Sequence, residues 1–236
     1  MKNPLKKISC IAAIAVTVLM VKPVRGQQAS ASQASSPVTT ANADEGLQKK
    51  ALEWAASLQL NDASKTQKVQ AAILAHLTAV RDWHNSHPFA LTPAGVNPAT
   101  GNKLSDMDRQ IIVCSAKPKT IHDSLMMVLK AELDTTRVEA VLDKYTVGKV
   151  AFTLKGYQAI VPDLTAKEET EILKNLKQAR EQAIDYKSMK EISAIFEIYK
   201  TKCEQYLNNN GRNWRQLFKA YTDKIKAQKE ADKNKQ

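Results

Sequence analysis

The sequence predicts an all-α protein, a single-domain bundle of several helices. Glycine is scarce, with 7 residues in 236, while hydrophobic residues make up 43% of the chain. Turn-rich β-sandwiches and barrels usually contain more glycine, whereas long helices need little. Apolar residues also recur every three or four positions in seven separate stretches, which is the spacing of one helix face. Because each apolar face needs a partner, this pattern predicts a packed bundle.

The first 26 residues have the pattern of a secretory signal peptide. Lysines precede an uncharged apolar stretch from Ile8 to Val21, and the small residues Val24 and Gly26 offer a cleavage site. The stretch is shorter than the ~20 residues that span a bilayer, so we expect no stable membrane insertion after cleavage. We therefore expect export to the periplasm, with the cell surface or the medium as alternatives. Arg25 within the cleavage site leaves a retained N-terminal anchor as a further alternative.

Residues 27–43 carry no charge and almost no large side chain, which predicts a flexible Ser/Ala/Gln-rich spacer. The helical domain is expected over residues 44–228, followed by a charged tail at 229–236. The formal net charge of +11 falls to +6 without the signal pattern, which contains five basic residues and no acidic one. A charge this modest on an exported protein argues against nucleic acid as a partner.

The predicted helices carry their own start signals. Thr165 and Ser188 each precede a glutamate by three residues, the spacing of a capping box, in which each side chain bonds the other residue's backbone amide. Ser105 and Thr120 precede an aspartate at the same spacing, a weaker version of the motif. The apolar faces lie, in chain order, within residues 47–58, 69–83, 121–129, 138–145, 172–183, 192–207 and 214–225.

Two segments interrupt this helical pattern. Residues 88–102 contain three prolines and two glycines and predict a long loop, and loops of this length inside compact domains are often functional. Residues 147–160 fit an alternating strand as well as a helix, so their secondary structure is left open.

The sequence contains no catalytic motif that we can identify. It has no nucleophile elbow, glycine-rich phosphate loop, H-E-x-x-H or C-x-x-C. We expect no catalytic residue, no cofactor and no metal, because two histidines three residues apart are a weak metal signal. A hydrolase that uses Asp82, His84 and His87 is kept as an alternative. His122, next to Asp123, is interpreted as part of a first helical turn.

The densest polar and aromatic cluster precedes and enters the predicted loop. An indole can cover the apolar face of a sugar ring, while amide and imidazole groups bond its hydroxyls. The alternative is that Trp83 closes the core, and His76 is interpreted as a core histidine. The candidate ligand-binding residues here are Trp83, His84, Asn85, His87 and Phe89.

Three further candidates lie in the second half of the chain. Arg212, Asn213 and Trp214 follow an asparagine-rich turn, and a guanidinium suits the carboxylate of a uronic acid. The alternative is that Trp214 is buried. Tyr157, beside Gly156, would be an exposed stacking surface or a core residue.

Two cysteines follow the signal pattern, Cys114 and Cys203. In the oxidising surroundings of an exported protein, these two cysteines can form a disulfide. Cys203 also lies on an apolar helix face, where a buried free thiol behaves as a small hydrophobic side chain. Both alternatives are kept.

Long strings of the sequence resemble an exported bacterial family catalogued as domain of unknown function 3826. The resemblance covers roughly residues 47 to 225 and implies an all-α fold. The family is described as sugar-binding and often occurs beside polysaccharide-degrading genes, which implies a non-catalytic carbohydrate-binding or polysaccharide-utilisation accessory protein with an oligosaccharide or polysaccharide ligand. The strings are RDWHNSHPFALTPAGVNPATGNKLSDMDRQII, DKYTVGKVAFTLKGYQAIVPDLT and LKNLKQAREQAIDYKSMKEISAIFEIYKTKCEQYLNNNGRNWRQLF.

A weaker similarity is to the Spy-type periplasmic helical chaperones, whose helices open with Leu-Thr-x-x-Gln. Here Leu164 and Thr165 are followed by Glu168 in place of the glutamine. The alternative function is therefore a chaperone or interaction scaffold, which would be a homodimer with a concave, partly apolar face.

Overall fold

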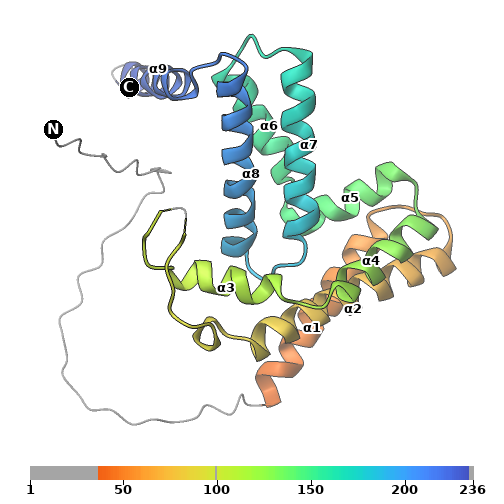
Figure 1. The fold of residues 1–236 in the computed structure, drawn as a ribbon. Helices are drawn as coiled ribbons and strands as arrows, with labels where there is room; N and C mark the ends of the chain where they lie inside the picture. Colours follow the sequence, from red (N-terminus) through yellow and green to blue (C-terminus); the bar gives the residue numbers. More distant parts are fainter. Residues whose placement is uncertain (1–36, 99, 234–236) are drawn as a thin grey trace. The chain divides into compact units, whose positions relative to one another are not determined.

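The structure, a computed structural model, describes residues 37–98 and 100–233. These residues are helical almost throughout (Figure 1). The prediction of an all-α fold is confirmed. Among the described helices, none combines the length and hydropathy that a bilayer span requires. The elements are α1 (Pro37–Ala56), α2 (Ala63–Ser86), the 3-10 helix η1 (Phe89–Leu91), α3 (Asp106–Ser115), α4 (Lys119–Glu132), α5 (Thr135–Thr146), α6 (Lys149–Ile160), α7 (Ala166–Ala183), α8 (Met189–Asn209) and α9 (Trp214–Lys233).

The first helix begins before the predicted boundary between spacer and domain. Helix α1, and with it the compact unit, begins at Pro37 and not near Asp44. Proline is favourable in a first helical turn, where its missing N–H would have no intrahelical partner, and neither glycine nor a second proline interrupts residues 38–43. The predicted signal peptide and residues 27–36 of the predicted spacer lie outside the described residues. Residues 229–233 of the predicted tail continue α9.

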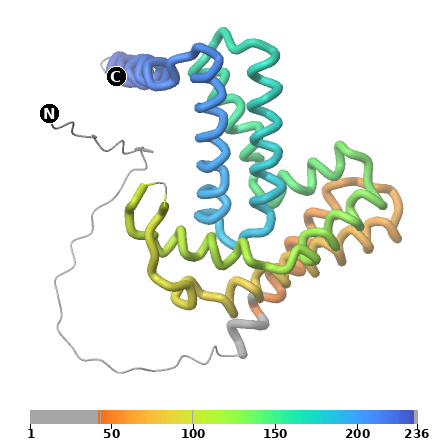
Figure 2. The backbone as a smooth tube through the Cα atoms, in the orientation of Figure 1, coloured from red at the N-terminus to blue at the C-terminus, as the bar shows by residue number. Residues whose placement is uncertain are grey.

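The apolar faces pack into two hydrophobic clusters. The first joins α1, α2, α4 and α5 and includes the fully buried Ile73, Leu129 and Val141. The second is built mainly on α6, α7 and α8 and includes Ile172 and Leu176. Helices α7 and α8 run antiparallel, joined by a short connection (Figure 2). Burial of each aliphatic side chain contributes about 1.5–3 kcal/mol, so these faces dominate the stability.

The short connection between α7 and α8 takes part in both clusters. Ile184 is buried in the first cluster, whereas Tyr186, two residues later, is buried in the second. Asp185 lies between these two anchors, so the packing of both clusters fixes its position.

Within the ambiguous segment at 147–160, residues 149–160 form helix α6. Val150 and Tyr157 are buried on one face of α6, and α6 is separated from α5 by Val147 and Gly148, which both adopt left-handed backbone conformations. The amides of these two residues donate to the carbonyl of Asp143, which closes the end of α5. The alternating pattern therefore reflects a helix with a narrow buried face.

Replacing Val147 with glycine is expected to raise the free energy of unfolding by about 1 kcal/mol, because a left-handed conformation costs a β-branched residue ~1–2 kcal/mol. The φ angle of Val147 is 53° and its side chain is 73% exposed, so little packing would be lost. Urea unfolding measures the change. Ile112→Gly, at an exposed position of α3, is the control and should lose about 1 kcal/mol. Lower stability in Val147→Gly would contradict the predicted strain.

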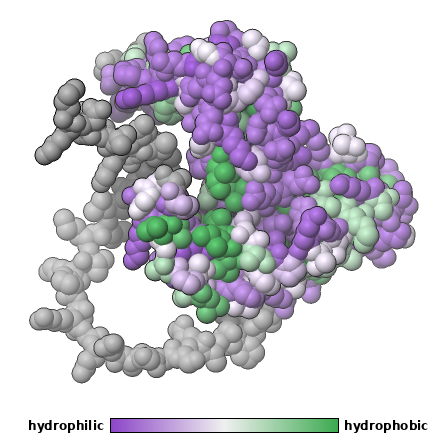
Figure 3. All heavy atoms as spheres, viewed as in Figure 1, coloured by the Kyte–Doolittle hydropathy of each residue, from purple (hydrophilic) through white to green (hydrophobic). Residues whose placement is uncertain are grey.

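The proline- and glycine-rich segment after α2 is a loop with local structure of its own. It contains η1, and Val96 pairs with Lys103 in an isolated antiparallel bridge. Gln110 of α3 accepts a hydrogen bond from the backbone amide of Phe89 at 2.9 Å, which ties the loop to α3. In the view of Figure 3, apolar side chains gather over this loop and α3. Leu91 and Val96, both in the loop, are exposed.

Candidate ligand-binding site

Asp185 is the centre of a polar cluster that links four segments of the chain. Its Oδ1 accepts a hydrogen bond from Nε2 of His76, on α2, at 3.0 Å. Its Oδ2 lies 3.1 Å from Nζ of Lys117 and 3.2 Å from Nδ1 of His122, at the start of α4. Three donors therefore converge on one largely buried carboxylate.

The helices position the hydrogen-bond donors of this cluster. His76 is buried on the apolar face of α2, as its place in the stripe predicts, and its ring meets Tyr145 edge-to-face with centroids 5.3 Å apart. Lys117 precedes α4 and its side chain is only 7% exposed. An ammonium group this buried needs a counter-ion, which Asp185 supplies.

The cluster fixes the charges of its members. Burial alone would raise the pKa of Asp185, but hydrogen bonds from His122 and His76 and the charge of Lys117 together hold it well below the ordinary 3.8. The hydrogen bond that His122 donates to Asp185 raises the pKa of His122 above 6.5, against the effect of burial, and the negative charge of Glu181 raises it further. Asp185 is thus a carboxylate, and His122 is held in a state that favours the imidazolium.

These two shifts predict that the cluster contributes most to stability between about pH 4 and 6.5. The depressed pKa of Asp185 gives a contribution that is present above 3.8 and lost as the pH falls through the folded-state pKa. The raised pKa of His122 gives one that is present below 6.5 and lost as the pH rises through its folded-state value. Urea unfolding should therefore give a lower free energy at about pH 9 than at about pH 5.5. His122→Gln should narrow this difference, and an unchanged difference would contradict the contribution of the pair.

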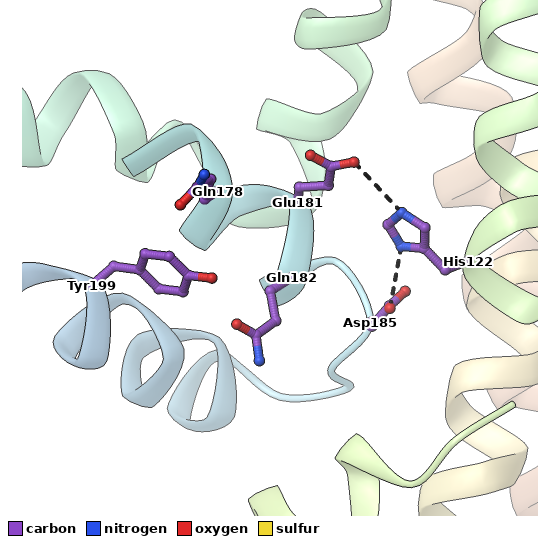
Figure 4. A pocket seen from close by; sticks show the side chains of 6 residues that line it. All are labelled: His122, Gln178, Glu181, Gln182, Asp185 and Tyr199. Carbon is purple, nitrogen blue, oxygen red and sulfur yellow. Dashed lines mark ion pairs between the residues drawn. The ribbon is translucent and has the colours of Figure 1, made fainter. Parts of the chain in front are cut away.

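His122 and Asp185 form one end of a pocket of about 280 Å³. Figure 4 shows the His122 ring between the carboxylates of Glu181 and Asp185, with the other lining side chains farther along α7 and on α8. Glu181 is 53% exposed, and its Oε1 lies 3.8 Å from Nε2 of His122, beyond hydrogen-bond distance. The lining residues are His122, Gln178, Glu181, Gln182, Asp185 and Tyr199.

The pocket combines hydrogen-bond donors and acceptors with an aromatic ring. The amides of Gln178 and Gln182 both donate and accept, the carboxylate of Glu181 accepts, and the imidazole of His122 donates. One face of the Tyr199 ring carries Nζ of Lys202, 4.2 Å from its centroid. Within residues 37–98 and 100–233, no group of three or more His, Cys, Asp or Glu side chains has a metal-binding arrangement. The amides, carboxylates, imidazole and aromatic ring that line the pocket suit a ligand rich in hydroxyls.

The side chains predicted around Trp83 lie outside this pocket and contact other parts of the protein. The Trp83 ring stacks on His87 with centroids 3.8 Å apart, and its Nε1 donates to the carbonyl of Val113 at 3.3 Å. Nε2 of His84 lies 3.0 Å from Oε1 of the buried Glu191. These contacts join α2 to α3 and to the start of α8.

The flanking candidates of this first cluster are also engaged. Asn85 accepts a hydrogen bond from Nζ of Lys187 at 2.6 Å, and the guanidinium of Arg109 lies over the Phe89 ring, 5.2 Å from its centroid. The residues around Trp83 thus fasten α2 and the loop to their neighbours.

The candidates of the second half form a separate group. Tyr157 is buried and its hydroxyl donates to the carbonyl of Lys200 at 3.1 Å, so an exposed stacking role for it is wrong. Its ring packs on Trp214, 5.1 Å away, which is half-buried. The buried alternatives therefore describe both aromatic residues better.

Arg212 and Asn213 act on nearby helix ends. Arg212 binds the carboxylates of Glu168, at 2.9 Å, and of Asp163, at 2.7 Å. The hydrogen bonds from Arg212 hold the pKa of Glu168 down at about 2. Asn213 is exposed and accepts from the amide of Gln216, which caps α9. The guanidinium predicted for a uronic acid is thus already paired with two carboxylates.

The two cysteines are free and buried, so the disulfide alternative is not realised. Cys114, on α3, lies 3.9 Å from Oε1 of Glu191, whereas Cys203, on α8, faces the carbonyl of Ile172 at 4.0 Å. Burial raises the pKa of the Cys203 thiol to about 12, which keeps it protonated and unreactive.

Comparison with known protein families assigns the chain to one of them. The model of the family described as "Protein of unknown function (DUF3826)" matches residues 45–227. The chain belongs to this family. No curated protein matches the sequence. The matched region of this DUF3826 protein contains the Asp185 cluster and every residue that lines the pocket.

Sequence analysis of this DUF3826 protein missed the pocket, although one signal was present. Glu181, Gln182 and Asp185 follow Gln178 at helical spacings of three, four and seven residues, so they share a face beside the apolar face of α7. A polar stripe of this kind usually belongs to a solvated surface. This stripe differs from an ordinary solvated surface because His122, on α4, and Tyr199, on α8, line the same pocket.

Proposed function

We propose that this DUF3826 protein binds a carbohydrate without catalysis, in the pocket between α4, α7 and α8. The observation that carries the proposal is the set of side chains at the pocket: two amides, an imidazole, two carboxylates and a tyrosine line one space. Sugars are recognised by such mixtures, because each hydroxyl both donates and accepts. The resemblance to a family described as sugar-binding supports the same function.

The arrangement of the carboxylates favours binding over glycoside hydrolysis. Hydrolysis normally uses two carboxyl groups on opposite sides of the scissile bond. Here Glu181 and Asp185 lie four residues apart and share His122, and Asp185 is already bound by three donors. Both carboxylates are therefore on the same side of the pocket. Asp185 positions His122, and Glu181 is the carboxylate open to a ligand.

We further propose that the protein acts after export, most simply in the periplasm, as an accessory in polysaccharide utilisation. The signal pattern of the first 26 residues supports export. The family resemblance supports the link to polysaccharides.

A thermal-shift screen of the purified protein against neutral and acidic oligosaccharides tests the function. A ligand at 100 times its Kd should stabilise the folded state by about 2.7 kcal/mol, which gives a clear rise in Tm. Glu181→Ala and Tyr199→Ala should abolish the shift, because each removes a group that lines the pocket. Asn85→Ala, in the cluster around Trp83, is the matched control and should keep it. A shift lost only in the control would refute the proposed site.

One observation favours the alternative function of a chaperone or interaction scaffold. An almost wholly apolar groove of about 480 Å³ runs between α2 and α4, lined by alanines and by the exposed Met127, with the Lys68–Glu132 ion pair at its rim. The alternative predicts a homodimer that suppresses the aggregation of an unfolding client protein. Met127→Asp would abolish that suppression. Suppression of this kind, together with no response to any oligosaccharide, would place the alternative first.

A further inference from the structure

Resting on the proposed function, we infer that the pocket selects neutral sugars over uronic acids, and that Glu181 sets this selectivity. The argument starts from the charges that a ligand would meet. Both carboxylates of the pocket come from α7 and the connection after it, and the only cationic group in the lining is His122. No lysine or arginine is among the lining residues, so nothing there pairs with a sugar carboxylate in the bidentate manner.

Three cationic side chains lie beside lining residues, in contact or in sequence, without lining the pocket themselves. Nζ of Lys117 is bound to Asp185 on the buried side of the cluster and does not line the pocket. Arg180, next to Glu181 in the sequence, does not line the pocket and binds Asp143 at 2.7 Å. Lys202 lies on the ring of Tyr199 and is also absent from the lining.

The charge of Asp185 is held at hydrogen-bond distance by its partners, whereas that of Glu181 is not. Asp185 is compensated by Lys117 and His122 at hydrogen-bond distance. Glu181 has only His122, at 3.8 Å, and this imidazole is shared with Asp185. A half-exposed carboxylate with no cation at hydrogen-bond distance repels an anionic ligand that approaches it, while its oxygens remain free to accept from two hydroxyls.

Glu181 and His122 therefore present an acceptor next to a donor. Two adjacent hydroxyls of a neutral sugar can donate to Glu181 and accept from Nε2 of His122 at the same time. A sugar carboxylate offers only acceptors, so it gains nothing from Glu181. The pocket thus discriminates against uronic acids by repulsion as well as by the loss of a hydrogen bond.

The test uses pairs of ligands that differ only in charge. Calorimetric titration compares β-1,4-galactotetraose, β-1,4-mannotetraose and cellotetraose with their C6-oxidised, uronate forms. It also compares the methyl ester of tetragalacturonate with the free acid. We expect the neutral member of each binding pair to bind at least about 10-fold more tightly, with a ratio that falls as added salt screens the repulsion.

Two variants assign the selectivity. Glu181→Gln keeps an acceptor and removes the charge, so the ratio between neutral and acidic ligands should fall toward one. Glu171→Gln, on the same helix but paired with Lys174 outside the pocket, should leave the ratio unchanged. Tighter binding of the acids, or a ratio that Glu181→Gln does not change, would overturn the inference while leaving the proposed function in place. Failure of every tetrasaccharide to bind would overturn the proposed function itself.

Discussion

Asp185→Asn is expected to lower the free energy of unfolding by about 3–5 kcal/mol, the usual cost of removing one partner from a buried ion pair. The substitution leaves the ammonium of Lys117, 7% exposed, without a counter-ion, and it weakens the hydrogen bonds from His76 and His122. Because Asp185 lies between residues of the two hydrophobic clusters, the loss is expected to affect both. Urea unfolding followed by circular dichroism measures it.

Asp123→Asn provides the matched control for this substitution. Asp123 is half-exposed on α4 and pairs with Lys119 at 3.7 Å, so its loss should cost less than about 0.5 kcal/mol. Lys117→Met in the Asp185→Asn background should recover part of the stability, because it removes the unpaired charge. A loss below about 1 kcal/mol in Asp185→Asn would show that the Asp185 cluster contributes little to holding the two hydrophobic clusters together.

Glu191→Ala is expected to cost about 3 kcal/mol, because it removes both a helix cap and a buried polar contact with His84. Oε2 of Glu191 accepts from the amide of Ser188 at 2.8 Å and completes the capping box of α8, while Oε1 lies 3.0 Å from Nε2 of His84. Glu191→Gln keeps an acceptor for the cap, so it should lose less than Glu191→Ala. Both losses are measured by urea unfolding.

A comparison with the capping box of α3 separates the two contributions of Glu191 to stability, the helix cap and the contact with His84. Asp108 completes that box with Ser105 and is exposed, so Asp108→Ala removes only a cap and should cost about 1 kcal/mol. The excess cost of Glu191→Ala over Asp108→Ala then measures the buried pair with His84. Equal losses in the two variants would mean that this pair contributes nothing.

The helices themselves could be predicted, because their signals are local. The capping boxes that begin at Ser105, Thr165 and Ser188 are all formed. The weaker one at Thr120 is not formed, since α4 already begins at Lys119 and Thr120 lies inside its first turn. The segment at 147–160 stayed ambiguous because a short helix with two buried residues also satisfies an alternating pattern.

The site could not be predicted in the same way, because its contacts join distant parts of the chain. His76 is 109 residues from Asp185, and their contact depends on how α2 packs against the connection between α7 and α8. Asp123, the sequence neighbour of His122, forms its ion pair with Lys119 instead. Trp83 and Trp214 are predicted as candidate ligand-binding residues because they are aromatic residues in polar stretches of the sequence. In the structure, each ring packs against neighbouring side chains.

The most direct test of the carbohydrate site follows the four histidines of the chain by NMR. Their imidazole resonances are assigned with single His→Gln variants, and a neutral oligosaccharide identified in the thermal-shift screen is then titrated into the protein. We predict that the His122 resonances shift with ligand concentration while those of His84 and His87 stay in place. Shifts at His84 or His87 with an unchanged His122 would contradict the pocket and place the ligand beside Trp83.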